Sequence, residues 1–277
     1  MKSLFLGLAL ASGLAATAQT TPAPTFTSTC QNSGSGGTIY MGDRNQAFER
    51  QKRFCETRDL TMSAPKGQPL TVDGGNNGGI TVRGWDGPGV RIRAKIQTWG
   101  ASEQEAQAQA KAILITTTSN NLRAATPGNI QQGAVSFEVF VPRRTALALT
   151  THNGGISLTG LQGAIDFHAQ NGGVSLAELG GQVTGKTING GLSIKLSGHQ
   201  WEGSGLDVAT INGGITWQIP ANYSAQFFTS TNGGSIKTKL PVSKPKGQYH
   251  EVRANLGSGG QEVKAITNNG SVMIKQG

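Results

Sequence analysis

The residues whose types could support catalysis or metal binding are few and widely spaced. The four histidines are His152, His168, His199 and His250. His168 follows Asp166 by two positions, but no third residue stands at metal-ligand spacing. We therefore expect these side chains to be polar groups that face solvent, and we expect neither a metal nor a cofactor.

Cleavage of a polysaccharide would require two carboxylates about 5–10 Å apart. The best-placed acids are Glu202 and Asp207, which flank a predicted turn next to Trp201. The chain has no Gly-x-Ser-x-Gly elbow, phosphate loop or metalloprotease helix. We predict that the protein is not an enzyme, and we keep a carbohydrate-active enzyme that uses Glu202 and Asp207 as an alternative.

The dominant pattern of the chain is structural. The sequence Asn-Gly-Gly, followed by a short alternating apolar segment, begins at Asn77, Asn153, Asn171, Asn189, Asn212 and Asn232, with a degenerate copy at Asn269. From Asn153 onward the intervals are 18, 18, 23 and 20 residues. Such a period predicts stacked repeats, which more often form binding surfaces than catalytic pockets.

The repeated corners predict specific roles for their residues. We expect Asn-Gly to supply a positive φ and the second glycine to allow neighbouring coils to approach closely. Stacked asparagines could form a ladder of side-chain amides. The predicted structural residues are Asn77, Gly78, Asn153, Gly154, Asn171, Gly172, Asn189, Gly190, Asn212, Gly213, Asn232 and Gly233. The small residues two positions before the asparagines should form one buried file: Thr151, Ala169, Thr187, Thr210 and Ser230.

Two all-β architectures fit these repeats. In a right-handed parallel β-solenoid, or β-helix, each repeat forms one coil and equivalent residues stack. In an antiparallel β-meander, each repeat forms one hairpin. Stacking explains the matched asparagines and small residues, so we favour the solenoid, with one short inserted helix, and keep the meander as the alternative.

The chain divides into five expected segments. Residues 1–18 have a basic start, an apolar stretch and a small-residue cleavage site, which indicate a signal peptide. We therefore expect an exported protein in the periplasm, on the cell surface or outside the cell. The other segments are a flexible Thr/Pro lead-in (19–29), a disulfide-stapled part (30–69), a β-rich part with a helix at about 103–115 (70–146), and the repeat solenoid (147–277).

The cysteine count, the net charge and the lengths of the apolar segments limit the classes of cross-link and binding partner to be expected. The two cysteines, Cys30 and Cys55, predict a disulfide in an exported chain. The net charge is +9, but no aromatic residues interleave with the basic ones, so we do not expect a nucleic-acid partner. Apart from the signal peptide, no segment approaches the ~18 apolar residues of a membrane span. The oligomeric state is left open.

Most of residues 55–277 resemble the putative-adhesin family of exported bacterial proteins, whose function is unknown. The resemblance rests on residues 77–86, on the capped helix, on residues 139–142 and on the serial Asn-Gly turns. It implies a β-solenoid with a role at the cell envelope or surface. We expect a non-catalytic, adhesin-like protein that binds or organises envelope polysaccharide or another surface component. A self-assembling structural envelope protein is the further alternative.

Overall fold

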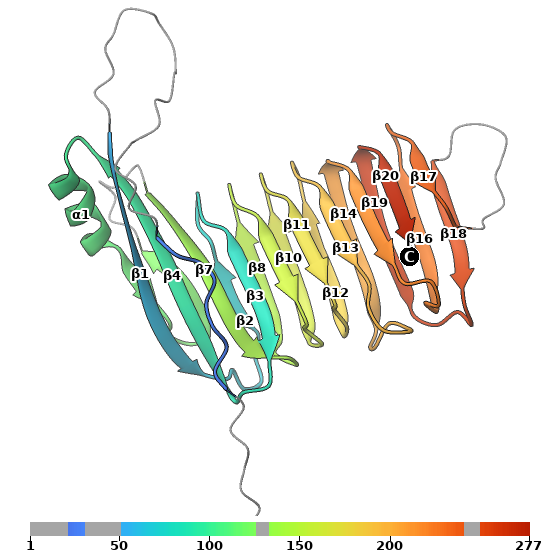
Figure 1. Ribbon diagram of the computed structural model, residues 1–277, viewed down its shortest axis with the longest axis horizontal. Coiled ribbons are helices and arrows are strands. Elements are labelled where there is room, and N and C mark those ends of the chain that lie inside the picture. The colour runs from blue at the N-terminus through green and yellow to red at the C-terminus, as the bar shows by residue number, and fades with distance from the viewer. Residues whose placement is uncertain (1–21, 31–50, 126–132, 241–249) are drawn as a thin grey trace, which may run out of the picture.

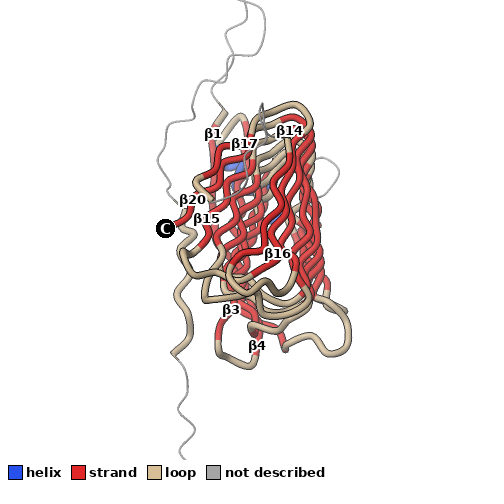
Figure 2. The backbone as a smooth tube through the Cα atoms, turned by 90° about the vertical axis from the view of Figure 1, so that its right-hand side faces the viewer, coloured by secondary structure: helices blue, strands red, loops and turns tan. Residues whose placement is uncertain are grey.

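The computed structural model describes residues 22–30, 51–125, 133–240 and 250–277, so the predicted signal peptide at 1–18 lies outside the described residues. The described chain is all-β apart from one helix, α1 (Glu103–Ala112). Its strands form two large mixed sheets, which run side by side along the long axis of the molecule (Figure 1). Seen along that axis, successive strands lie behind one another (Figure 2).

Each sheet contains ten strands. The first sheet has the order β1 (Lys52–Ser63), β4 (Gly89–Gly100), β7 (Gly133–Pro142), β3 (Ile80–Trp85), β9 (Ile156–Thr159), β11 (Val174–Ala177), β13 (Leu192–Lys195), β15 (Ile215–Ile219), β20 (Val272–Gln276) and β17 (Ile236–Thr238). The second has the order β18 (Glu251–Leu256), β16 (Ala225–Thr231), β19 (Glu262–Asn269), β14 (Gly205–Asn212), β12 (Gln182–Thr187), β10 (Ala164–Ala169), β8 (Leu147–Thr151), β2 (Leu70–Asp73), β6 (Asn121–Ala125) and β5 (Leu114–Thr116).

Each Asn-Gly-Gly corner from Asn153 to Asn212 connects a strand of the second sheet to a strand of the first. Strands from successive repeats pair in parallel, β8–β10–β12–β14 in one sheet and β9–β11–β13–β15 in the other. The register is uniform, with Val174 opposite Ile156 on one side and Leu192 on the other. Equivalent positions of the repeats therefore lie directly beside one another.

Apolar and polar residues alternate along the strands, so one face of each sheet is buried. The inward positions are apolar, for example Ile156 and Leu158 in β9 and Ile165 and Phe167 in β10, and they form one continuous core. The helix α1 packs against β1 and β4 and buries the side chain of Ala106. No helix in the described part of the chain is long and apolar enough to cross a membrane.

The predicted helix begins where its capping residue indicated and ends earlier than expected. Ser102 Oγ accepts a hydrogen bond from Glu105 N at 3.1 Å, and the Glu105 carboxylate accepts one from Ala101 N at 2.8 Å. The helix ends at Ala112 and not near residue 115, because Ile113 has an extended backbone and β5 starts at Leu114. Residues with β-branched side chains favour that change.

The glycines of the corners have different roles from those predicted. None of the first glycines in the Asn-Gly-Gly copies has a positive φ. A Cβ atom on Gly172 would instead lie 2.0 Å from Gly154 O, whereas one on Gly173 would lie 3.6 Å from Gly191 O. Close stacking therefore requires the first glycine in the copies from Asn77 to Asn212, but the second glycine, Gly234, in the copy at Asn232, where a Cβ would lie 2.1 Å from Gly270 O. The expectation that the first glycine supplies a positive φ is wrong.

The asparagines form the expected amide ladder. Each side-chain Nδ2 donates to Oδ1 of the neighbouring copy, at 3.1 Å for Asn153 to Asn77, 2.8 Å for Asn171 to Asn153, 2.7 Å for Asn189 to Asn171, and 2.8 Å for both Asn212 to Asn189 and Asn269 to Asn212. On the inner side of the ladder, buried threonines donate to carbonyls of the preceding coil, as Thr187 Oγ1 does to Gly172 O at 2.8 Å. Ser230 was wrongly placed in this file, because its neighbour Thr231 is the buried residue that pairs with Thr267.

Stacking follows chain order from β8 to β15 and departs from it at both ends. The last two strands, β19 and β20, lie between β14–β15 and the earlier pair β16–β17. Accordingly, Asn232 donates its amide to Asn268 and not to Asn212. At the opposite end, β6 and β7 pair with β2 and β3, on the side away from β8 and β9.

Candidate binding surface

The outward face of the first sheet carries two parallel rows of small residues. One is a hydroxyl row, in which neighbouring strands place Thr81, Ser157, Ser175, Ser193 and Thr216 opposite one another. The other is a glycine row, two positions earlier on each strand: Gly79, Gly155, Gly173, Gly191 and Gly214. The residue between the two rows points into the core on every strand, so the rows follow from the period-two alternation.

These rows form the floor of two adjoining hollows, which we call the outer groove. One hollow of about 490 Å³ lies over β7, β3, β9 and the start of β11, and another of about 530 Å³ continues over β11, β13, β15 and β20. Gly173 and Ser175 line both. The outer groove thus crosses the strands, and its hydroxyls recur at the strand spacing of roughly 4.8 Å.

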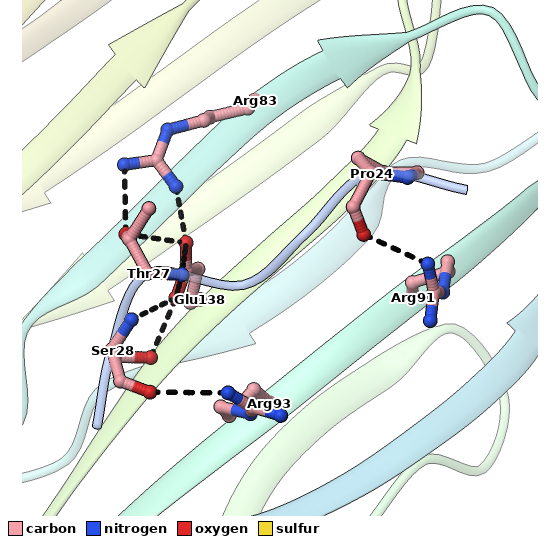
Figure 3. A network of polar contacts seen from close by, with 7 residues as sticks. All are labelled: Pro24, Thr27, Ser28, Arg83, Arg91, Arg93 and Glu138. Carbon is pink, nitrogen blue, oxygen red and sulfur yellow. Dashed lines mark hydrogen bonds and ion pairs between the residues drawn. The ribbon is translucent and has the colours of Figure 1, made fainter. Parts of the chain in front are cut away.

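One end of the outer groove is bounded by residues 22–30, the N-terminal arm. Figure 3 shows this arm lying on the outward face of β3, β4 and β7. The Glu138 carboxylate accepts hydrogen bonds from the backbone N–H of Thr27 at 3.0 Å and of Ser28 at 2.8 Å. It also accepts from the two hydroxyls, at 2.9 Å and 2.6 Å respectively, and forms an ion pair with Arg83.

Further contacts hold the rest of the arm. Arg91 donates to the carbonyl of Pro24 at 2.8 Å and Arg93 to that of Ser28 at 3.2 Å. The Phe26 ring is buried, with the Arg93 guanidinium carbon 4.6 Å from its centroid. The centroid of the Phe140 ring lies 5.4 Å from that of Phe26. The predicted disulfide between Cys30 and Cys55 attaches the arm to β1.

This docking differs from the flexible lead-in expected at residues 19–29. Where the structure describes that segment, it lies against the sheet and buries Phe26. One weak indication of docking is present in the sequence, a single aromatic residue in a Thr/Pro-rich stretch. Arg91 and Arg93 alternate with apolar residues along β4, but such a pattern cannot show what covers the outward face of a strand.

Charges beneath the arm neutralise one another. Burial raises the pKa of Glu138, but hydrogen bonds from Ser28 and Thr27 outweigh this effect and hold the pKa at about 2. Hydrogen bonds from Arg93, at 2.7 Å to each oxygen, hold the pKa of Asp59 below its usual range.

Among the residues that line the outer groove, Glu138 is the only charged one. The groove is therefore essentially uncharged despite the basic composition of the chain.

The residues considered for catalysis lie elsewhere. Asp207 is exposed on β14 in the second sheet, where it accepts a hydrogen bond from Lys264 Nζ at 3.0 Å. Glu202 precedes that strand, and the neighbouring Trp201 is buried and donates to Gly181 O at 2.9 Å. Neither acid lines the outer groove.

The histidines form no cluster with other potential metal ligands. The two residues singled out, Asp166 and His168, both lie on β10, and Asp166 accepts a hydrogen bond from Thr184 Oγ1 at 2.9 Å. Over the described ranges, no group of three histidine, cysteine or acidic side chains is placed to hold a metal ion. Asp166 and His168 thus share a face of one strand without a third potential ligand among the described residues.

Comparison with known proteins finds solved structures of low sequence identity and low TM-score. No family model matches the chain, and no curated protein matches its sequence. A putative cell adhesion protein from Clostridium sporogenes aligns with 80% of this chain and 100% of its own, at 12% identity and a TM-score of 0.41. A putative lipid binding protein from Parabacteroides distasonis aligns with 80% of this chain and 96% of its own, at 13% identity and a TM-score of 0.35. A putative adhesin from Bacteroides fragilis aligns with 80% of this chain and 97% of its own, at 12% identity and a TM-score of 0.34. Adhesin is thus a name given to several structures that this chain is similar to.

Proposed function

We propose that the protein is a non-catalytic, adhesin-like β-solenoid, right-handed and parallel, that holds an uncharged polysaccharide of the envelope or extracellular matrix along the outer groove. The signal peptide proposed at residues 1–18 would deliver it to the periplasm, the cell surface or the medium. The observation that carries the proposal is the outer groove itself, a long uncharged surface in which hydroxyl groups recur once per strand.

The chemistry of the groove favours a repeating neutral ligand. Each hydroxyl both donates and accepts, which matches the hydroxyls of a sugar chain. A single hydrogen bond contributes only about 0.5–1.5 kcal/mol, so binding would depend on several strands at once. Because the lining carries no free charge, binding should persist at moderate salt.

Two of the five positions in the glycine row give further support, whereas a Cβ at Gly155, Gly191 or Gly214 would lie only 3.0–3.1 Å from a backbone oxygen. At Gly79 and Gly173 φ is not positive, and an added Cβ would meet its nearest neighbour at 3.4 and 3.6 Å, which is ordinary contact. The fold therefore does not require glycine at these two positions. What glycine provides there is an open floor, on which a ligand can approach the backbone.

A retention assay tests the proposal. The mature chain is incubated with a neutral capsular or extracellular polysaccharide and, as charged polymers, with isolated peptidoglycan and lipopolysaccharide, at low and moderate salt. We expect saturable retention on the neutral polysaccharide that survives moderate salt. Ser175→Trp, which fills the groove where its two hollows meet, should weaken retention at least fivefold.

Lys186→Trp is the matched control, because Lys186 is exposed in the following strand, β12, on the second sheet. It should leave retention unchanged. Retention that disappears with salt, or that both tryptophan variants reduce equally, would contradict binding in the outer groove.

A further inference from the structure

A group of lysines lies on the outward face of the first sheet, at the end opposite the N-terminal arm. Lys275 lies on β20, Lys237 lies on β17, the last strand of the sheet, and Lys239 follows β17 directly. All three are exposed, and so is Met273, which lies opposite Lys237 and is 43% exposed. We call these four residues the lysine patch. Figure 1 shows its two strands, β17 and β20, at one end of the molecule.

The charge of the lysine patch is not neutralised within the described part of the chain. The neighbouring strands β13, β15, β20 and β17 contain no aspartate or glutamate. Their remaining lysine, Lys195, pairs with Glu178 at 3.1 Å, and at the same end of the second sheet Arg253 pairs with Glu251 at 2.6 Å. Among the described residues, no carboxylate pairs with a lysine of the patch. The patch is therefore a local excess of positive charge.

The lysines of the patch lie outside the hollows of the outer groove. Met273 lines the second hollow, whereas Lys237, Lys239 and Lys275 line neither. The lysines project from adjoining strands, which are roughly 4.8 Å apart. The patch thus places several positive charges and one apolar side chain side by side on the face of a sheet. Such a face suits a partner whose negative charges lie in a plane above an apolar layer.

We propose that the lysine patch holds the protein on the surface of a membrane that contains anionic phospholipids. The lysine ammonium groups contact the lipid phosphates, and Met273 reaches the apolar boundary below the headgroups. An acidic polysaccharide would also attract the lysines, but it has no apolar layer to receive Met273. The first hollow of the outer groove lies over β7, β3 and β9, away from this contact, and the proposal does not depend on a ligand in the groove.

Vesicle sedimentation tests the proposal. The chain is incubated with vesicles of phosphatidylcholine, with or without about 30% phosphatidylglycerol, and the bound fraction is measured. We expect binding to the anionic vesicles only, and its loss at about 1 M salt, where the Debye length is about 3 Å. The double variant Lys237→Gln/Lys275→Gln should weaken binding about 25-fold, because each lysine near an anionic surface contributes about fivefold.

The matched control is Lys111→Gln/Lys186→Gln, which removes two exposed lysines, one on α1 and one on β12, and lowers the net charge equally. It should weaken vesicle binding by less than about twofold. Equal weakening by the two double variants would overturn the lysine patch as the site of contact.

A second variant distinguishes a membrane from an acidic polymer. Met273→Gln keeps the three lysines of the patch and should weaken vesicle binding about threefold, because its apolar contact with the lipid is lost. Vesicle binding that Met273→Gln leaves unchanged, or tighter binding to a soluble acidic polysaccharide than to the vesicles, would overturn the membrane as the partner. Ser175→Trp should leave vesicle binding unchanged, and the Lys237/Lys275 variant should leave retention on the neutral polysaccharide unchanged, so the two proposals can fail separately.

Discussion

At the scale of single residues, the two glycines of one corner have opposite roles. Gly172 lies against the backbone of the preceding coil, so that even a methyl group would clash with Gly154 O at 2.0 Å. Gly173 faces the outer groove, where a methyl group would sit 3.6 Å from its nearest neighbour. The same dipeptide thus combines a packing constraint with an open surface.

This contrast predicts different effects of the same substitution. Gly172→Ala should lower the free energy of unfolding by about 2–3 kcal/mol, because the backbones of two coils must separate to admit the methyl group. Gly173→Ala should change it by less than about 0.5 kcal/mol. Chemical denaturation of the two variants measures the difference, and equal destabilisation would contradict the assigned roles.

Glu138 predicts a pH dependence of stability. Its pKa is about 2 in the folded chain against 4.5 as the ordinary value, so the unfolded state binds the proton more readily. The resulting stabilisation is complete above about pH 4.5 and is lost as the pH falls towards 2. The loss should amount to about 2–3 kcal/mol.

Glu138→Gln should therefore flatten the decrease in stability between pH 5 and pH 2, as measured by urea denaturation at each pH. Asp86→Asn is a suitable control. Hydrogen bonds from Arg143 hold the pKa of Asp86 below its usual range, but its side chain is exposed, so we expect little change in the pH profile. A profile unaffected by Glu138→Gln would show that the arm does not depend on this carboxylate.

At the scale of elements, the asparagine ladder joins successive corners through their side chains. Asn171 both donates to Asn153 and accepts from Asn189, so Asn171→Ala removes two hydrogen bonds. We expect a loss of about 1–2 kcal/mol. Asn232→Ala, which removes the bond to Asn268, should cost about half as much. Thermal unfolding of both variants tests this, and an unchanged melting temperature for Asn171→Ala would mean that water replaces the ladder.

The elements also show which features of the structure could be predicted from the sequence and which could not. Local patterns predicted the parallel-stacking repeats, the amide ladder, the disulfide and the start of α1, because each depends on residues a fixed distance apart. The docking of the arm could not be predicted in this way, since Phe26 and Glu138 lie far apart in the sequence and share no period. The glycine roles were misassigned because a sequence does not distinguish a positive φ from a close approach.

At the scale of the whole molecule, the order of stacking differs from the order of the chain. The pair β16–β17 meets the rest of the sheets through β19 and β20, which follow it in sequence. Within the described residues, β17 pairs only with β20, and β16 pairs with β19 and β18. The C-terminal strands are therefore internal.

Truncation after Leu256 should consequently affect residues that it does not remove. Amides in β16 and β17 should exchange with solvent faster by at least a hundredfold, because their connection to β14 and β15 is lost. Amides in β8 to β13 should stay protected, as expected for a stacked array with nearest-neighbour interfaces. Hydrogen exchange followed by mass spectrometry distinguishes the two regions. Because β16 can still pair with β18, the decisive strand is β17, and protection retained in β17 would mean that the pair β16–β17 can stack directly on β14 and β15.

The position of these last strands has a consequence for how the chain is made. The chain is synthesised from its N-terminus, so residues 225–238 are complete before the strands that they must join. Until residues 262–276 follow, the core beyond β14 and β15 has no adjoining coil, and any prematurely terminated chain keeps that exposed end. Proteases act on exposed, unpaired segments, so the fold itself distinguishes finished molecules from unfinished ones.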